Sequence, residues 1–214
     1  MTKSALIVWG GWEGHEPEAC ANVVADMLST HGFNVNLTDT TEAFADPDLA
    51  KYDLITPVIT MSKIEKDELK NLIAAVRAGS GLGGFHGQMC DTFRNEPDYQ
   101  FMVGGQWVAH PGDIIDYDVK VTKPDDPIMA GISDFPYHSE QYYIHYDPSI
   151  EILATTRFNG SIFDEIEGVE MPVVWKRRFG KGRVFHSTLG HIAEEFKVPQ
   201  MRTILERGLL WAAR

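Results

Sequence analysis

The segment Gly83-Gly84-Phe85-His86-Gly87-Gln88 gathers residue types that could do chemistry at one sharp turn. It follows a short apolar run and precedes a helix-compatible segment. Glycines on both sides of His86 let the backbone turn tightly and present that side chain at a strand end, as nucleophile elbows present serine or cysteine. A histidine does not readily replace an acyl-forming hydroxyl or thiol, but it can transfer protons or bind a metal. The turn therefore predicts a functional imidazole.

Two more histidines and one carboxylate extend this candidate site. His191 follows Gly190 at the end of an apolar run, His15 lies in a glycine-rich loop, and Glu140 lies in a polar segment flanked by prolines. Two chemistries are open. In the first, His15, His86 and His191 bind a divalent metal such as zinc, and Glu140 is a general base or a further ligand. In the second, His86 and His191 form a metal-free acid/base catalytic pair, and Glu140 orients one of the rings.

Aromatic and polar side chains near these positions suit a sugar ligand, because aromatic faces can stack on the apolar side of a pyranose ring. The candidate substrate-binding residues are Trp12, His15, Gln88, Asp91, His110 and Tyr142. Ordinary glycoside hydrolysis requires a second carboxylate beside Glu140, for which Asp91 or Glu13 could serve. No nucleotide cofactor is expected, because Trp12 and Glu13 would obstruct and repel a phosphate in the first glycine-rich loop.

The elements that must position these residues alternate along the chain. Strands are predicted at residues 4–9, 34–37, 54–59 and 81–85, and helices at 17–30, 65–77 and 198–213. This alternation predicts an α/β fold with a mostly parallel sheet, helices on both faces and ligands beyond the carboxyl ends of the strands. Residues 173–189 predict an antiparallel C-terminal hairpin with its turn at 179–182. Without a linker or repeat, residues 1–214 are expected to form one domain.

Composition and charge limit the classes of partner. The net charge of −12 and the pI near 5.0 disfavour nucleic acid and anionic membrane surfaces, which require clustered Lys and Arg. No apolar run approaches the length of a membrane span. Two cysteines, Cys20 and Cys90, without a CxxC pair or a recognisable signal peptide, favour a cytoplasmic location. The architecture is compatible with a homo-oligomer, but the sequence sets no stoichiometry.

An ordered set of short motifs runs through the whole chain. It comprises Gly83-Gly84-Phe85-His86-Gly87, Val103-Gly104-Gly105, His110-Pro111, Glu140-Gln141-Tyr142-Tyr143, Pro172-Val173-Val174-Trp175, Gly180-Lys181-Gly182-Arg183-Val184-Phe185 and Gly190-His191. The set resembles the ThuA-like, trehalose-utilisation family. The resemblance implies a flavodoxin-like, class I glutamine amidotransferase-like three-layer sandwich. Amidotransferases of this fold carry cysteine at the elbow where this chain has His86, and Cys90 is displaced by four residues, so glutaminase activity is not expected.

The resemblance also implies disaccharide catabolism, often beside a sugar dehydrogenase. We therefore expect an enzyme that acts on a trehalose-type disaccharide or its keto derivative through His86, Glu140 and His191. Trehalose has no carbonyl, so proton transfer beside a carbonyl requires an oxidised, keto form of the sugar, which a dehydrogenase would supply. The alternative is a non-catalytic sugar-binding or accessory protein on the same fold.

Overall fold

A nine-stranded mixed sheet forms the centre of the computed structural model, which describes residues 2–214. Its strands are β1 (Ser4–Gly11), β2 (Asn34–Thr38), β3 (Leu54–Thr60), β4 (Gly81–Phe85), β6 (Ile114–Val121), β7 (Phe135–Glu140), β9 (Glu151–Arg157), β10 (Glu170–Phe179) and β11 (Gly182–Ser187). The spatial order is β2-β1-β3-β4-β11-β10-β9-β6-β7. Pairings from β2 to β11 are parallel, and those from β11 to β7 are antiparallel. The predicted parallel strands and C-terminal hairpin are confirmed.

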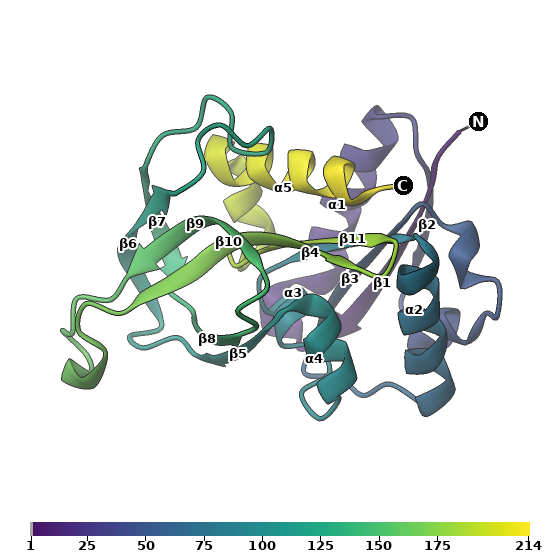
Figure 1. Ribbon diagram of the computed structural model, residues 1–214, viewed down its shortest axis with the longest axis horizontal. Coiled ribbons are helices and arrows are strands. Elements are labelled where there is room, and N and C mark those ends of the chain that lie inside the picture. Colours follow the sequence, from purple (N-terminus) through teal and green to yellow (C-terminus); the bar gives the residue numbers. More distant parts are fainter. Residues whose placement is uncertain (1) are drawn as a thin grey trace.

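Helices cover both faces of this sheet (Figure 1). The helices are α1 (Pro17–Thr30), α2 (Lys66–Ala78), α3 (Gly87–Cys90), α4 (Pro97–Val103) and α5 (Pro199–Ala212). Short 3-10 helices span Glu13–His15, Thr41–Ala45, Leu49–Lys51, Asp164–Ile166 and Ala193–Lys197. Helices α1 and α5 lie on one face, and α2 and α4 on the other. The predicted mixed α/β class is therefore confirmed.

The boundaries of α2 show how local sequence sets these elements. Glu65 caps its first turn, and the Glu68 carboxylate accepts a hydrogen bond from the Glu65 backbone N–H at 3.0 Å, which completes a capping box. The helix ends at Gly79, whose φ of 131° is open to glycine and strained for other residues. Between these signals, Leu69, Leu72 and Val76 recur at helical spacing and are buried against the sheet.

Strand β3 continues through Pro57 without a break. Its pairing with β4 covers only Leu54 and Ile55, whereas its pairing with β1 runs on to Thr60. Proline lacks a backbone N–H and is tolerated where a ladder bond is not required. The end of the β3–β4 pairing before Pro57 therefore lets the strand continue.

A second, two-stranded sheet and an edge strand escaped the sequence analysis. Strands β5 (Gly105–Ala109) and β8 (Tyr143–Tyr146) pair antiparallel, and β7 occupies the proline-flanked segment that ends at Glu140. Both segments are short and rich in polar or aromatic residues. These segments form strands because they pair with segments far along the chain, so the local sequence pattern does not predict them.

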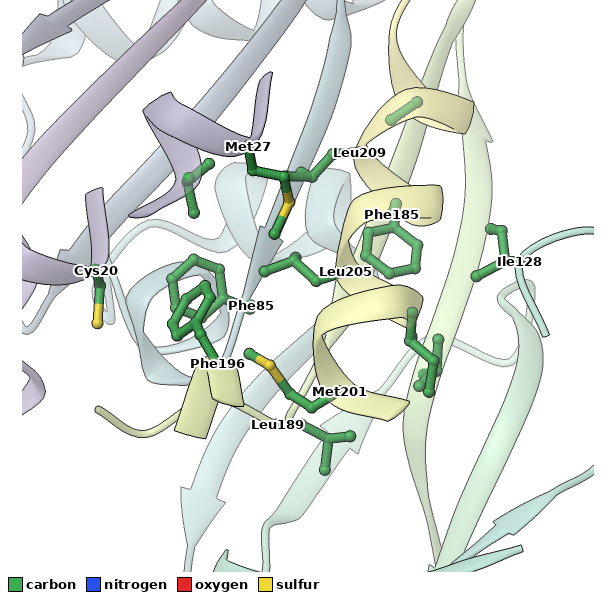
Figure 2. Close-up of a cluster of buried hydrophobic side chains, with 14 of the residues drawn as sticks. Cys20, Met27, Phe85, Ile128, Phe185, Leu189, Phe196, Met201, Leu205 and Leu209 are labelled. Atoms are coloured by element: carbon green, nitrogen blue, oxygen red, sulfur yellow. The ribbon is translucent and has the colours of Figure 1, made fainter. Parts of the chain in front are cut away.

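Two hydrophobic clusters, one on each face, hold the helices to the sheet. In the cluster beneath α5, Leu205, Leu209 and Met201 of the helix pack with Phe85 of β4 and Phe185 of β11 (Figure 2). These side chains are at most 1% exposed. Burying one such side chain contributes about 1.5–3 kcal/mol, so this packing offsets the local strain at His86, directly after β4.

No helix among residues 2–214 combines the length and the hydropathy that crossing a membrane requires.

Gly208 gives a test of the α5–sheet packing. Replacing a helix-interior glycine with alanine ordinarily stabilises a helix by up to about 1 kcal/mol. Here an added Cβ would overlap the Phe185 ring, so we expect Gly208→Ala to destabilise the fold by about 1–3 kcal/mol in urea unfolding. Arg202→Ala, at an exposed position of the same helix, is the control. A Gly208→Ala protein more stable than wild type would contradict this packing.

Candidate active site at the carboxyl ends of the parallel strands

Three histidines from three strand ends lie side by side. His15 follows β1 at the end of a 3-10 turn, His86 follows β4 directly, and His191 follows β11 by a few residues. The ring centroids are 4.7 Å apart for His15 and His86, 5.2 Å for His86 and His191, and 4.9 Å for His15 and His191. Carboxyl ends of parallel strands meet at one edge of the sheet. This geometry brings together residues that are up to 176 positions apart in the sequence.

His86 occupies a strained turn between β4 and α3. Its φ and ψ of 48° and −157° fall in a region that is almost exclusive to glycine, so the conformation costs of order 1–3 kcal/mol. The flanking glycines provide space. A Cβ at Gly84 would lie 2.8 Å from the Met89 sulfur, and one at Gly87 would lie 2.8 Å from His15 Cε1. The predicted elbow is thus present, with an imidazole at its tip.

Backbone strain in the described residues concentrates around this site. The four non-glycine residues with positive φ are Glu16, Met61, His86 and Asp113. Glu16 directly follows His15. Met61 and Asp113 line the cavity into which the histidine cluster opens. Such conformations persist only where the surrounding fold enforces them, and they cluster at functional sites. Met61 and Asp113, which are neither histidines nor next to the three clustered histidines in sequence, therefore point to the same site.

The contacts of His86 favour a positive charge at its outer nitrogen. Nδ1 lies 2.8 Å from the Thr188 carbonyl oxygen and donates its proton there, so Nε2 of a neutral ring carries a lone pair. Around Nε2 lie Glu140 Oε2 at 3.0 Å, the Tyr142 hydroxyl at 2.7 Å and His191 Nδ1 at 3.2 Å. A lone pair facing a carboxylate oxygen is repulsive unless a cation lies between them. That cation is either a proton on His86 or a bound metal ion.

His15 is arranged in the same way. Its Nδ1 is hydrogen-bonded to Thr60 Oγ1 at 2.8 Å, which leaves Nε2 available to a ligand. Metal-binding histidines usually hold their second ring nitrogen in such a bond, because it fixes the tautomer and the ring orientation. Burial, followed by the charges of His86 and His191, lowers the pKa of His15 to about 2. His15 is therefore neutral, as a metal ligand must be.

Four residues offer ligand atoms to one point. One ligand atom each from His15, His86, Glu140 and His191 can be chosen so that all lie within 4.8 Å of one another. Ligands about 2.1 Å from a tetrahedral zinc ion lie about 3.4 Å apart. The separations of 3.2 Å for His86–His191, 3.0 Å for His86–Glu140 and 3.6 Å for His191–Glu140 bracket that value. Three imidazoles and a carboxylate are a donor set that suits zinc or another divalent transition metal.

Glu140 is held in its ionised form. Burial is the largest single influence and would raise its pKa, but it is outweighed by the hydrogen bond from His86 and by the charges of His86, His191 and His110. The resulting pKa is lowered to about 2. Its Oε2 faces His86, and its Oε1 lies 3.6 Å from His191 Nδ1 and 3.7 Å from His110 Nε2. The carboxylate can therefore bind a cation with one oxygen and accept a proton at the other.

The cluster opens into a cavity of about 430 Å³. Of the sequence-predicted site residues, Trp12, His15, Asp91, His110, Glu140, Tyr142 and His191 line it. His86 and Gln88 do not, because both are completely buried. His86 meets the cavity only through its neighbours in the cluster, and Gln88 donates a hydrogen bond at 2.6 Å to the backbone carbonyl of His15. Gln88 thus holds the His15 loop in place, although it was predicted to bind substrate.

Sequence reasoning missed several residues of the cavity wall: Thr60, Met61, Arg94, Asp113 and Ile114. Thr60 ends β3, so the rule that placed His86 at a strand end could have found it. Arg94 forms a two-point ion pair with Asp91, at 2.6 and 2.8 Å, and its guanidinium lies 4.9 Å from the Trp107 ring centroid. No local sequence pattern predicts that arrangement.

Neither cysteine is placed to act as a nucleophile. Cys20 and Cys90 are buried and are not among the residues that line the cavity. The Cys90 thiol donates to the backbone carbonyl of His86 at 3.3 Å, and complete burial raises its pKa well above the ordinary value. A protonated, enclosed thiol does not attack a substrate.

These features define an α/β protein with a histidine- and glutamate-lined cavity at the carboxyl ends of its parallel strands. The profile of the ThuA family, described as trehalose utilisation, matches residues 4–212. The chain belongs to this family. No protein with a curated description matches the chain significantly.

Solved structures share the fold over nearly the whole chain. A ThuA-like protein from Bacteroides uniformis is 18% identical with a TM-score of 0.80, over 98% of this chain and 91% of that one. One from Parabacteroides merdae is also 18% identical, with a TM-score of 0.79 over 99% and 89%. A β-galactosidase from Bacillus circulans is 16% identical with a TM-score of 0.60, over 96% of this chain and 31% of that one. At these identities the likeness is one of fold.

The lowered pKa values predict acid sensitivity. Below pH 6.5 the unfolded chain takes up a proton at His15 that the folded chain refuses, so the free energy of unfolding falls as the pH falls. Below pH 4.5, Glu140 adds to the loss, because its folded pKa is about 2. With a chelator present, His15→Asn should reduce the pH dependence of the free energy of unfolding between pH 6.5 and 4.5. In this range, one proton taken up on unfolding lowers that free energy by up to about 1.4 kcal/mol per pH unit.

Urea unfolding at several pH values measures this decline. His138→Asn is the control, because His138 is exposed on β7 and lies outside the cavity. The same slope in His15→Asn and wild type would contradict the neutral state assigned to His15.

Proposed function

We propose that this chain is a cytoplasmic enzyme of sugar catabolism. Its substrate is a trehalose-type disaccharide or a keto derivative of one, and its cavity binds a divalent cation such as zinc between His15, His86, Glu140 and His191. One observation carries the proposal: His86 Nε2 lies 3.0 Å from Glu140 Oε2, while His86 Nδ1 is hydrogen-bonded to the Thr188 carbonyl. The family's description as trehalose utilisation supports the choice of sugar.

The fold is proposed to be a single domain of the flavodoxin-like, class I glutamine amidotransferase type. Support comes from the parallel order β2-β1-β3-β4-β11, the helices on both faces and the strained turn at His86 after β4. In this assignment His86 replaces the nucleophile of an amidotransferase, and a cation site replaces the acyl-forming chemistry.

The chemistry proposed is removal of a proton from a carbon next to the sugar carbonyl. A bound divalent cation would supply Lewis-acid polarisation of that carbonyl. Glu140 accepts the proton at Oε1 and passes it to His110, the flanking imidazole that is not a ligand in the proposed cation site. Return of the proton to the former carbonyl carbon, while the proton of the adjoining hydroxyl moves to the carbonyl oxygen, gives an isomerised sugar, and no oxidant is consumed. A sugar dehydrogenase acting earlier would supply the keto form.

A second candidate needs no metal. The Tyr142 hydroxyl lies 2.7 Å from His86 Nε2 and can donate a hydrogen bond to its lone pair. In that case His86 and His191, with ring nitrogens 3.2 Å apart, form an acid/base pair, and Glu140 stabilises the charged state. A non-catalytic sugar-binding protein is the remaining alternative, and it predicts affinity for the sugar without turnover.

Metal content separates the two chemistries. We expect protein purified without a histidine tag to bind one divalent cation per chain, measured by elemental analysis and by titration calorimetry with zinc. His86→Ala and Glu140→Gln should each weaken binding more than 100-fold. Thr60→Val, which removes the outer hydrogen bond to His15, should cost about 10–100-fold.

His138→Ala controls for the loss of an exposed histidine and should bind the cation like wild type. If tag-free wild type takes up none of zinc, manganese, cobalt or nickel after supplementation, the cation site is wrong and the acid/base pair stands.

Proton exchange tests whether the protein is an enzyme. In deuterated water, wild type should exchange the C–H beside the carbonyl of keto-trehalose, followed by NMR as loss of that signal. Glu140→Gln should slow the exchange by about 10²–10⁴-fold, the usual contribution of a positioned base, and His138→Gln should leave it unchanged. Binding of keto-trehalose with neither exchange nor product would favour the non-catalytic alternative.

A further inference from the structure

The cavity is polar at its floor and apolar at its mouth. His15 and Glu140 are buried, whereas three large apolar side chains that line the same cavity are strongly exposed: Trp12 at 46%, Met61 at 44% and Ile114 at 42%. Exposed apolar surface gathered at a cavity is typical of a binding site. The cation chemistry proposed above uses only the floor, so the mouth has no role in it.

Trp12 is fixed in place although almost half of it is exposed. Its backbone N–H donates to the Thr60 carbonyl at 3.0 Å, and its ring meets the His15 ring edge-on at 4.8 Å between centroids. A Cβ on residue 14 would overlap Cζ2 and Cη2 of the indole. The φ of Gly14 is not in the left-handed region, so the lack of a side chain there provides space for the ring. The indole is therefore a preformed platform.

Met61 is presented at the cavity mouth by a strained backbone. Its φ is 52°, which lies in the left-handed region, where glycine and asparagine have the smallest conformational free-energy cost. Two backbone hydrogen bonds of 2.9 Å, from Met61 to Asp91 and from Ser62 to Thr92, hold the turn. Strain at a residue with an exposed, flexible apolar side chain is consistent with a function for that side chain.

The charges at the cavity disfavour an anionic ligand at the mouth. Arg94 is the only Lys or Arg among the lining residues, and Asp91 already binds it at two points. Asp113, whose side chain is 90% exposed, adds a further carboxylate. A phosphate or carboxylate at the mouth would therefore find repulsion and no free cation, whereas a neutral apolar group would find Trp12, Met61 and Ile114.

We propose that Trp12, Met61 and Ile114 form an outer subsite for an uncharged, flat apolar aglycone. The substrate class is then a glycoside whose sugar ring enters the inner cavity and whose second group, an aryl group or the apolar face of another sugar, lies on Trp12. This inference rests on the proposed sugar function and adds that the protein accepts aryl glycosides as well as disaccharides.

Binding of two probes tests the subsite. Phenyl α-D-glucoside should bind about tenfold more tightly than methyl α-D-glucoside in calorimetry, because the phenyl ring covers apolar surface on the indole. Trp12→Ala should bring the ratio of the two affinities close to one. Gly14→Ala, which displaces the ring without removing it, should also lower the ratio.

Phe101→Ala is the matched control, because Phe101 is an exposed aromatic that does not line the cavity. It should keep the full preference for the phenyl glucoside. Equal affinities for the two glucosides in wild type, or a ratio unchanged in Trp12→Ala, would overturn the subsite and leave the sugar function standing. Failure of both glucosides and of trehalose to bind would overturn the sugar function and, with it, the subsite.

Discussion

A buried imidazole lone pair that faces a carboxylate is the constraint on which the site depends. His86 commits Nδ1 to the Thr188 carbonyl, so a positive charge on the ring or on a bound ion stabilises the approach of Nε2 to the Glu140 oxygen 3.0 Å away. The rest of the cluster follows from this need. His15 and His191 are neutral donors close enough to share the charge, and burial makes each contact strong, because water cannot screen it.

The fold accepts local strain in order to hold this arrangement. His86 and Met61 have backbone conformations that cost free energy. The lack of a side chain at Gly84 leaves room for Met89, and at Gly87 for His15. The two hydrophobic clusters, one on each face of the sheet, compensate for that cost. Leu205 of α5 and Phe185 of β11, both buried in one of these clusters, illustrate the rigid packing that holds the helix to β4 and β11.

Much of the fold could be predicted from the sequence, because its parallel half repeats a local strand-then-helix pattern. Apolar runs followed by amphipathic helices located β1 to β4, α1 and α2 within a few residues. The β5–β8 sheet and β7 were not predicted, since their pairing partners are distant and their patterning is weak. For the site, the glycines around His86 and the strand-end rule identified the three histidines, whereas Arg94 and Met61 gave no local signal.

The sequence by itself determined the tip of the elbow, because Gly84 and Gly87 on either side of Phe85 and His86 favour a turn that presents an imidazole. It also determined the parallel strands whose ends must meet. Only the tertiary structure decided what the imidazole does. It buried His86 out of the cavity, turned Nε2 towards Glu140 and placed Gln88 beneath the His15 loop. Those outcomes depend on distances between segments far apart in the chain, which local composition does not encode.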